Sequence, residues 1–490
     1  MPPPNILYIH SHDTGRYVQP YGHQVPTPNI QMLADQGVFF RQAFCAAPTC
    51  SGSRAALLTG QYCHSNGMFG LAHRGWSLNN YGQHIVHPLR EAGYHSVLIG
   101  EQHVSVDPEV VGYDEVLDLD SNHTADVAPT ANGVLRRLPE PFFMSAGFFE
   151  THREFAAPTS VQDTLHSLPA PNLPDTLATR EDMAALKASA RSLDQGIGSV
   201  LNELYVLGLA ERTLVVCTTD HGLAFPRAKA TLYDRGTGVM LLMRGPEGFS
   251  GGKVVDSIVS HLDVYPTLCE VAGVEPPDFV QGTSLMPLIR GEVPAVREEV
   301  FTEMTFHAAY EPLRAVRTNR WKYIRRFHDY ENPVLANCDD SDTKDLLVAA
   351  GWGAQIVPEE QLYDLVLDPN ENCDLSADPG HAGTLAELRD RVEAWMRETA
   401  DPLLDGPIEP PRGAIVNRQD ALSPTEEPRG VDPLEETGAL GLEAPADLGV
   451  EPEMRRQSDG INDDWAKRFS ELRLGTEFDL VPAVAASGDA

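Results

Sequence analysis

The 490-residue chain carries 37 Lys and Arg against 71 Asp and Glu, a formal net charge of −34 at neutral pH. This acidity disfavours nucleic acid and anionic membranes as partners, so an anionic substrate has to be captured locally. Hydrophobic residues make up 42% of the chain, which is ordinary for a globular protein, and no apolar run approaches the about 18 residues of a membrane span.

The N-terminal residues 1–5 lead directly into an apolar segment without the basic region and cleavage site of a secretory signal, so we expect a cytoplasmic protein. The seven cysteines are scattered and odd in number, and none has C-x-x-C spacing. This usage indicates reduced thiols, and it argues against a disulfide framework and against a structural zinc site.

Residues 5–290 alternate short apolar runs with helical stretches, which predicts an α/β fold with a largely parallel sheet. The expected strands cover 6–9, 96–99, 142–146, 214–218 and 239–243, and the expected helices cover 28–36, 53–59, 182–207 and 261–272. Polar residues directly follow four of these strands: His12 and Asp13, Glu101 and His103, His152, and Asp220 and His221. Because the carboxyl ends of strands form the ligand crevice of such sheets, we expect the site there.

From about residue 300 the pattern changes to short strands at 300–304, 313–318 and 321–325, followed by a helix at 384–398. We therefore predict a catalytic α/β domain over 1–295 and a smaller α+β domain over 296–405. Residues 406–490 form an acidic tail, rich in Pro and Gly, that either wraps the body or is partly disordered. Within the tail, the near-helical spacing of Trp465, Phe469 and Leu472 predicts one short docked helix.

The segment 50–60, CSGSRAALLTG, resembles the sulfatase signature C-x-P-S-R followed by a helix and L-T-G, with Gly52 in place of the proline. In that family a formylglycine-generating enzyme oxidises the cysteine, here Cys50, to formylglycine, whose hydrate is a geminal diol. One hydroxyl attacks the substrate and the other later expels sulfate, whereas a serine would be left with a stable sulfate ester.

Flanking segments resemble other sulfatase motifs in the same order and extend the resemblance over about residues 5–400. They are NILYIHSHD at 5–13, GEQH at 100–103, ETHR at 150–153, TTDHG at 218–222 and FPRAKATLY at 225–233. The last of these, together with NGMFGL at 66–71, looks closest to the heparan N-sulfatase (sulfamidase) branch. The resemblance implies an alkaline-phosphatase-like large mixed sheet flanked by helices, with a smaller C-terminal α+β domain.

The resemblance also implies one divalent metal ion, held by His12, Asp13, Cys50 as formylglycine, Asp220 and His221. His12 stands where relatives have an aspartate. Two imidazoles with two carboxylates suit Mn or Zn better than the all-oxygen site preferred by Ca. The alternative for His12 is a supporting or packing role behind the ligands.

Four further residues take catalytic roles by resemblance. Arg54 is expected to bind the diol and the sulfate as a permanently charged donor. His103 is expected to take the proton from the hydroxyl that drives elimination. His152 and Lys229 are expected to hold the sulfate and to protonate the departing oxygen or nitrogen.

Four residues are expected to contact the substrate or its surroundings. Glu101 replaces the family's lysine, a change toward negative charge in an anion site, and either points at His12 or the metal or faces solvent. His73, Arg74 and His307 lie where relatives bring side chains that contact the substrate.

The sequence therefore predicts a hydrolase of sulfate esters or sulfamates that acts on a small anionic substrate. One alternative is a phosphodiesterase or phosphonate monoester hydrolase of the same superfamily, which the Asp220-His221 pair also suits. Another is a catalytically weakened binding protein, motivated by Gly52, Glu101 and His12. The natural substrate and the oligomeric state stay open.

Overall fold

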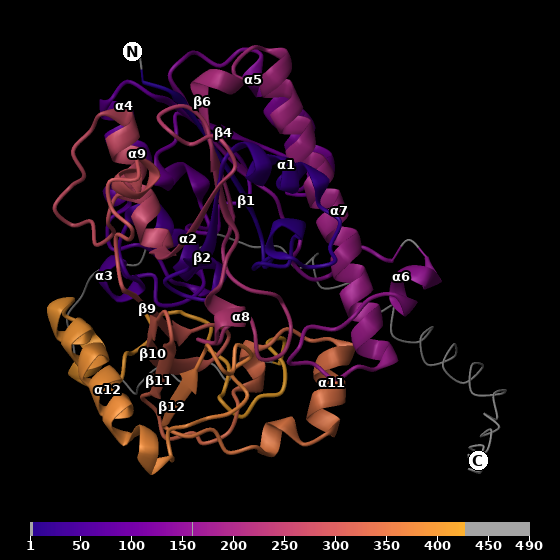
Figure 1. The fold of residues 1–490 in the computed structure, drawn as a ribbon, viewed down its shortest axis with the longest axis vertical. Coiled ribbons are helices and arrows are strands. Elements are labelled where there is room, and N and C mark those ends of the chain that lie inside the picture. The colour runs from indigo at the N-terminus through magenta and orange to yellow at the C-terminus, as the bar shows by residue number, and fades with distance from the viewer. Residues whose placement is uncertain (1–2, 159, 427–490) are drawn as a thin grey trace, which may run out of the picture. The chain divides into compact units, whose positions relative to one another are not determined.

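The computed structural model describes residues 3–158 and 160–426, which lie in one compact unit. Over these residues, eight strands form a large sheet in the order β4-β3-β5-β1-β6-β7-β2-β8 (Figure 1). Neighbours pair in parallel except for β7, which is antiparallel to both β6 and β2, so the prediction of a mixed sheet is confirmed. The strands are β1 Asn5–Ser11, β2 Val38–Phe44, β3 His95–Gly100, β4 Glu115–Leu117, β5 Phe142–Gly147, β6 Thr213–Thr219, β7 Leu241–Arg244 and β8 Lys253–Ser260.

Helices cover both faces of this sheet, because alternate residues of its buried strands are apolar toward each side. On one face Leu7 and Ile9 pack among side chains of α1, α5 and α7, and on the other Ile6 and Tyr8 pack among those of α2, α4 and α9 (Figure 1). The helices of this region are α1 Pro28–Gln36, α2 Cys50–Thr59, α3 Cys63–Asn66, α4 Val86–Glu91, α5 Thr124–Leu135, α6 Val161–Leu165, α7 Leu177–Val206, α8 Asp234–Thr237, α9 Val264–Ala272 and α10 Met286–Ile289.

The strand register brings the predicted polar segments to one edge of the sheet. Gly147 at the end of β5 lies opposite both His10 of β1 and Gly100 of β3, and Ser11 lies opposite Thr219 of β6. The segments that follow these four strands therefore start at the same level, and the expectation that they converge is confirmed.

A second, antiparallel sheet has the order β12-β11-β10-β9, and α12 packs on one of its faces. Its other face, which includes Leu313 and Ile324, contacts Ala230 and Leu232 and so supports the loop that carries Lys229. The division at 295/296 stays a prediction. The elements of this region are β9 Glu299–Phe306, β10 Tyr310–Thr318, β11 Trp321–Arg326, α11 Asp342–Ala349, β12 Glu360–Asp364 and α12 Ala382–Glu398.

The described part of the tail, residues 406–426, lies along the body. Ile415 N–H donates to Arg74 O at 2.9 Å, and Asn417 N–H donates to Ala308 O at 2.8 Å. The helix predicted around Trp465 lies outside the described residues.

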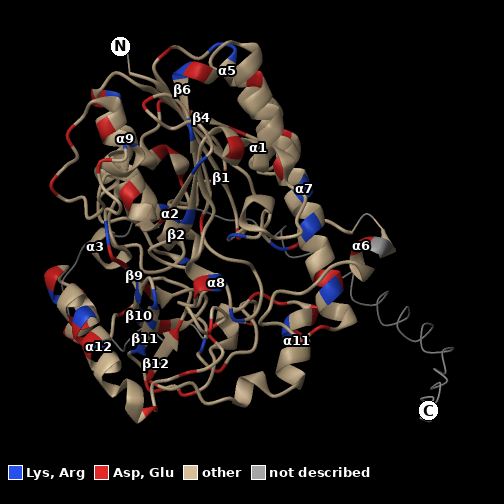
Figure 2. Ribbon diagram, in the orientation of Figure 1, with Lys and Arg blue, Asp and Glu red and all other residues tan. Residues whose placement is uncertain are grey.

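Three features of the composition can be compared with the structure. The seven cysteines form no disulfides, and Cys373 alone among them is exposed. No helix in the described ranges has the length and hydropathy required to cross a bilayer. Acidic and basic residues are interspersed along α7 and α12 (Figure 2), and on α12 they form ion pairs one turn apart.

Candidate active site

Cys50 is the first residue of α2, and its side chain is buried at the carboxyl edge of the large sheet. Its Sγ lies 3.3 Å from His221 Nε2. Burial alone would raise the pKa of this thiol, but the charges of Lys229, His12 and His221 hold it well below its ordinary value. The helix N-terminus also favours negative charge. The surroundings of Cys50 therefore favour a negative charge at this point.

The packing around Gly52 gives a physical reason for the missing proline. A Cβ atom at this position would lie 2.8 Å from Thr49 Oγ1 and 3.1 Å from Cys63 Sγ. Cys63 Sγ also donates a hydrogen bond to Gly52 O at 3.3 Å. The first turn of α2 therefore packs so closely against its neighbours that glycine fits where a side chain would have to displace them.

Two buried carboxylates and two imidazoles surround the Cys50 sulfur. His12 Nδ1 lies 3.0 Å from Asp13 Oδ1 and 3.2 Å from Asp220 Oδ2, and His221 Nε2 lies 3.2 Å from Asp13 Oδ1. Asp13 has a left-handed backbone with φ of 56°, and its N–H donates to Asp220 Oδ1 at 2.8 Å. Such strained geometry is common at functional sites.

This donor set fits a divalent metal ion. Donor atoms of His12, Asp13, Cys50 and Asp220 all lie within 4.8 Å of one another. Two ligand atoms bound side by side to an ion at about 2.1 Å are roughly 3 Å apart, close to the measured spacings. Burial would lower the pKa of His12, but Asp220, Cys50 and Asp13 hold it well above its ordinary value, in agreement with a concentration of negative charge at this point.

Arg54 lies behind the carboxylates and is 2% exposed. Its guanidinium donates to Asp220 Oδ2 and to Ser11 O, both at 3.0 Å, and to His10 Nδ1 at 2.5 Å. Since the guanidinium only donates, His10 has to be a neutral acceptor at Nδ1, in agreement with a pKa well below its ordinary value caused by burial and by Arg54.

Lys229 Nζ contacts three groups at the opposite side of the site. It donates to Asp13 Oδ2 at 2.9 Å and lies 3.3 Å from His152 Nε2 and 3.0 Å from Asp339 Oδ2. Burial alone would lower the pKa of Lys229, but Asp13 and Asp339 hold it well above its ordinary value, so the ammonium stays charged. Burial and the Lys229 charge lower the pKa of His152. Sequence reasoning missed Asp339, which belongs to no motif.

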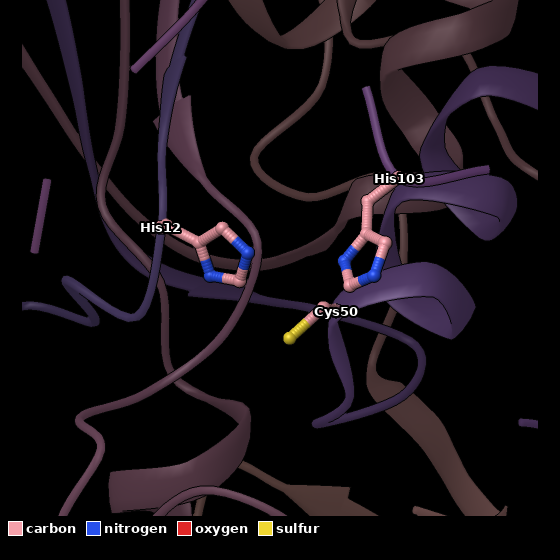
Figure 3. A group of neighbouring side chains, drawn as sticks. All are labelled: His12, Cys50 and His103. Atoms are coloured by element: carbon pink, nitrogen blue, oxygen red, sulfur yellow. The ribbon is translucent and has the colours of Figure 1, made fainter. Parts of the chain in front are cut away.

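His103 approaches Cys50 from the side opposite His12 (Figure 3). Its Nδ1 is buried and has no hydrogen-bond partner among the described residues, and its Nε2 lies 2.8 Å from His73 Nδ1. The predicted base therefore has one ring nitrogen free on the side of the site.

Glu101 is next to these imidazoles and accepts a hydrogen bond from Asn122 Nδ2 at 3.0 Å. Burial alone would raise its pKa, but His103, His12 and Arg54 lower it, so the carboxylate is ionised. Its charge thus acts on His12, while its direct partner, Asn122, was not expected from the sequence.

The two weaker substrate candidates differ in their surroundings. His307 is 5% exposed, and its buried Nδ1 lacks a hydrogen-bond partner within the described part of the chain. Arg74 instead donates to Asn417 Oδ1 at 2.8 Å and to Pro424 O at 2.9 Å, so its guanidinium binds the tail. The contact of Arg74 with substrate stays a prediction.

Comparison with known proteins identifies the family. A model of the sulfatase family matches residues 4–274. The chain belongs to the sulfatase family. A second model, described as N-sulphoglucosamine sulphohydrolase, C-terminal, matches residues 221–346. Human N-sulphoglucosamine sulphohydrolase is 29% identical over 474 residues, covering 83% of this sulfatase and 92% of the relative.

Solved structures share the fold. A putative sulfatase from Bacteroides thetaiotaomicron is similar with a TM-score of 0.67 at 24% identity, over 86% of this chain and 99% of that chain. A phosphonate monoester hydrolase from Silicibacter pomeroyi is similar with a TM-score of 0.62 at 21% identity, over 85% and 99%.

The family membership establishes that this sulfatase is an enzyme, a hydrolase of sulfate esters or sulfamates. The alternative of a weakened binding protein is therefore wrong. Its three motivating departures, Gly52, Glu101 and His12, have packing or charge partners in the structure.

Proposed function

We propose that Cys50 is converted to formylglycine and that the enzyme cleaves its substrate with this residue and one divalent ion. Asp13, Asp220 and residue 50 would hold the ion, together with His12 and His221. The observation that carries the proposal is the position of Cys50 Sγ at a helix N-terminus, within 4.8 Å of donor atoms of His12, Asp13 and Asp220. When bound, the ion would supply charge that favours the nucleophilic oxygen and the sulfate oxygens.

The side chains around residue 50 divide the remaining work. Arg54 fixes Asp220 at 3.0 Å and provides a buried positive charge beneath the site. Lys229 and His152, 3.3 Å apart, hold the sulfate and supply the proton to the departing oxygen or nitrogen. Lys229 Nζ contacts Asp13, His152 and Asp339, so a substrate oxygen has to replace one of these three groups. The carboxylate of Asp339 would be repelled by the incoming anion.

His103 acts after the alcohol or amine has left. Its free Nδ1 takes the proton from the second hydroxyl of residue 50, the bond from residue 50 to the sulfate oxygen breaks, and the aldehyde returns. This division predicts that His103→Ala gives a burst of released alcohol or amine followed by slow turnover, with sulfate retained on residue 50.

The substrate class that we propose to test first is an N-sulfated amino sugar. The support is the match of residues 221–346 to a C-terminal model described by N-sulphoglucosamine sulphohydrolase, together with the human relative of that name. In initial-rate measurements, kcat/KM should be highest for N-sulfoglucosamine, lower for an aryl sulfate and lowest for an aryl phosphodiester. A higher kcat/KM for the phosphodiester than for both sulfur substrates would refute the assignment.

A phosphonate or phosphate diester hydrolase is the second candidate. Glu101 in place of lysine lowers the positive charge of the site, and the phosphonate monoester hydrolase from Silicibacter pomeroyi has a similar fold. Adding a phosphonate monoester to the three substrates distinguishes the two candidates. If the second candidate is correct, the phosphonate monoester should be cleaved fastest.

A further inference from the structure

His73, which the sequence predicts to contact substrate, lies beside the predicted base. It belongs to a short 3₁₀ turn, Ala72–Arg74, whose first N–H donates to Ser51 Oγ at 2.9 Å. Because Ser51 is next to Cys50 on α2, this hydrogen bond fixes the turn relative to the nucleophile. The imidazoles of His73 and His103 lie edge to edge, with centroids 5.0 Å apart and planes only 9° apart.

The hydrogen bond between the two rings constrains the protons of His103. Its Nε2 lies 2.8 Å from His73 Nδ1, so one of these atoms donates and the other accepts. If His103 is to remove a proton with Nδ1, that nitrogen needs a lone pair and Nε2 has to carry the hydrogen. His73 must then be the acceptor at Nδ1, which a neutral imidazole can be and an imidazolium cannot.

We infer that His73 is a positioning residue, which accepts the Nε2–H of His103 and thereby keeps the Nδ1 lone pair of His103 directed at residue 50. The ring of His103 is directed toward Cys50 and His12 (Figure 3), and the donor atoms of the three residues lie within 4.8 Å of one another. His103 itself has a left-handed backbone with φ of 53°, a conformation that needs support from neighbouring contacts.

Burial and the neighbouring His103 lower the pKa of His73 to about 4. At neutral pH the His73 ring is therefore uncharged, and its lone pair is available to His103. Groups that hydrogen-bond the second ring nitrogen of a metal-ligating histidine typically change activity by about 10–100-fold when removed, and we take the same scale for His73.

This inference rests on the proposed function, in which His103 drives the release of sulfate. The proton of the second hydroxyl moves to His103 Nδ1, the carbon–oxygen bond to sulfate breaks with its electron pair on sulfate, and the carbonyl of residue 50 forms. Water then hydrates the aldehyde. His73 neither gains nor loses a proton in this step, and its role is to hold the tautomer.

The test uses purified enzyme in which conversion at residue 50 has been verified by mass. His73→Phe keeps a planar aromatic ring and removes the acceptor, whereas the Oδ1 of His73→Asn can accept in place of Nδ1. We expect His73→Phe to lower kcat about 10–100-fold equally for good and poor leaving groups, with a burst and with sulfate retained on residue 50. His73→Asn should recover most of the rate.

A matched control is His23→Phe, because His23 is another histidine beside a ring, that of Tyr17, with centroids 4.1 Å apart. It should leave kcat and KM unchanged. A burst in His103→Ala without one in His73→Phe, or a rise in KM alone in His73→Phe, overturns the role of His73. Absence of a burst in His103→Ala instead refutes the base assigned under the proposed function, and the inference fails with it.

Discussion

Replacement of Asp220 separates its role as a metal ligand from its role in holding the buried charges. Its Oδ1 accepts from the N–H groups of Asp13 and His221, each at 2.8 Å, and its Oδ2 lies 3.0 Å from the Arg54 guanidinium and 3.2 Å from His12 Nδ1. Asp220→Asn keeps an oxygen for the two N–H groups but removes the negative charge. Asp220→Ala removes both.

The two variants should differ in stability and agree in metal binding. In Asp220→Ala the buried Arg54 loses its ion-pair partner, which costs about 3–5 kcal/mol. Asp220→Asn also removes the charge that pairs with Arg54, but it keeps the hydrogen bonds to backbone, so its loss should be about 1–3 kcal/mol smaller than that of Asp220→Ala. Removal of groups behind a metal ligand already lowers affinity about 10–100-fold, so loss of a direct carboxylate ligand should exceed the upper end of that range.

The assay combines elemental analysis after dialysis, initial rates and urea unfolding in the presence of a chelator. We expect metal and activity to be lost in both variants and stability to fall further in Asp220→Ala than in Asp220→Asn. Asp194→Asn is the matched control: Asp194 is a buried carboxylate that binds the Ile30 N–H at 2.8 Å on α1, so metal should be retained. Unchanged metal content in Asp220→Asn would refute the reasoning.

Three further predictions test other parts of the molecule. Lys229→Met should slow poor leaving groups most, by about 10²–10⁴-fold, and a uniform loss across an aryl sulfate series would contradict the role of Lys229 in breaking the substrate bond. Glu311 accepts a hydrogen bond from Asn337 at 2.9 Å, and burial raises its pKa from 4.5 to about 7. Because the folded state then binds a proton more tightly than the unfolded state, the wild type loses stability as pH rises from 4.5 to 7. Relative to Glu311→Gln, the free energy of unfolding should fall by roughly 1–3 kcal/mol over that interval, and parallel urea profiles would contradict this. Arg314 donates to Asp401 Oδ2 at 2.6 Å, and both side chains are buried. Arg314→Met should therefore lower the free energy of unfolding in urea by about 3–5 kcal/mol and leave the metal content unchanged. A loss below about 1 kcal/mol would be inconsistent with this account.

The strands that lead to the site were predictable because each is a short apolar run with polar residues after it. β2, β4 and β8 of the large sheet were missed. β4 has only three residues, β2 contains the exposed Arg41 and the half-buried Gln42, and β8 has a largely exposed first half, so none stands out as a buried strand. α2 was predicted to start at Ser53 but starts at Cys50. The reason is that Ser53 Oγ donates to Asp220 O at 2.5 Å and does not cap the helix.

The candidate site was predictable where a motif places residues at strand ends. Asp339 reaches Lys229 from a loop of the second sheet region, and Asn122 and His73 reach Glu101 and His103 from other segments. These contacts depend on how distant segments pack, which neither hydrophobic periodicity nor local spacing encodes.

The state of residue 50 tests the central claim most directly. Trypsin should release residues 42–54, a peptide that contains both Cys45 and Cys50, so the buried and free Cys45 is an internal reference for alkylation. We predict that enzyme from its native host gives a peptide about 18 Da lighter than the unmodified sequence, with a single alkylated thiol at Cys45. Two alkylated thiols in a preparation with full sulfatase activity would contradict the account.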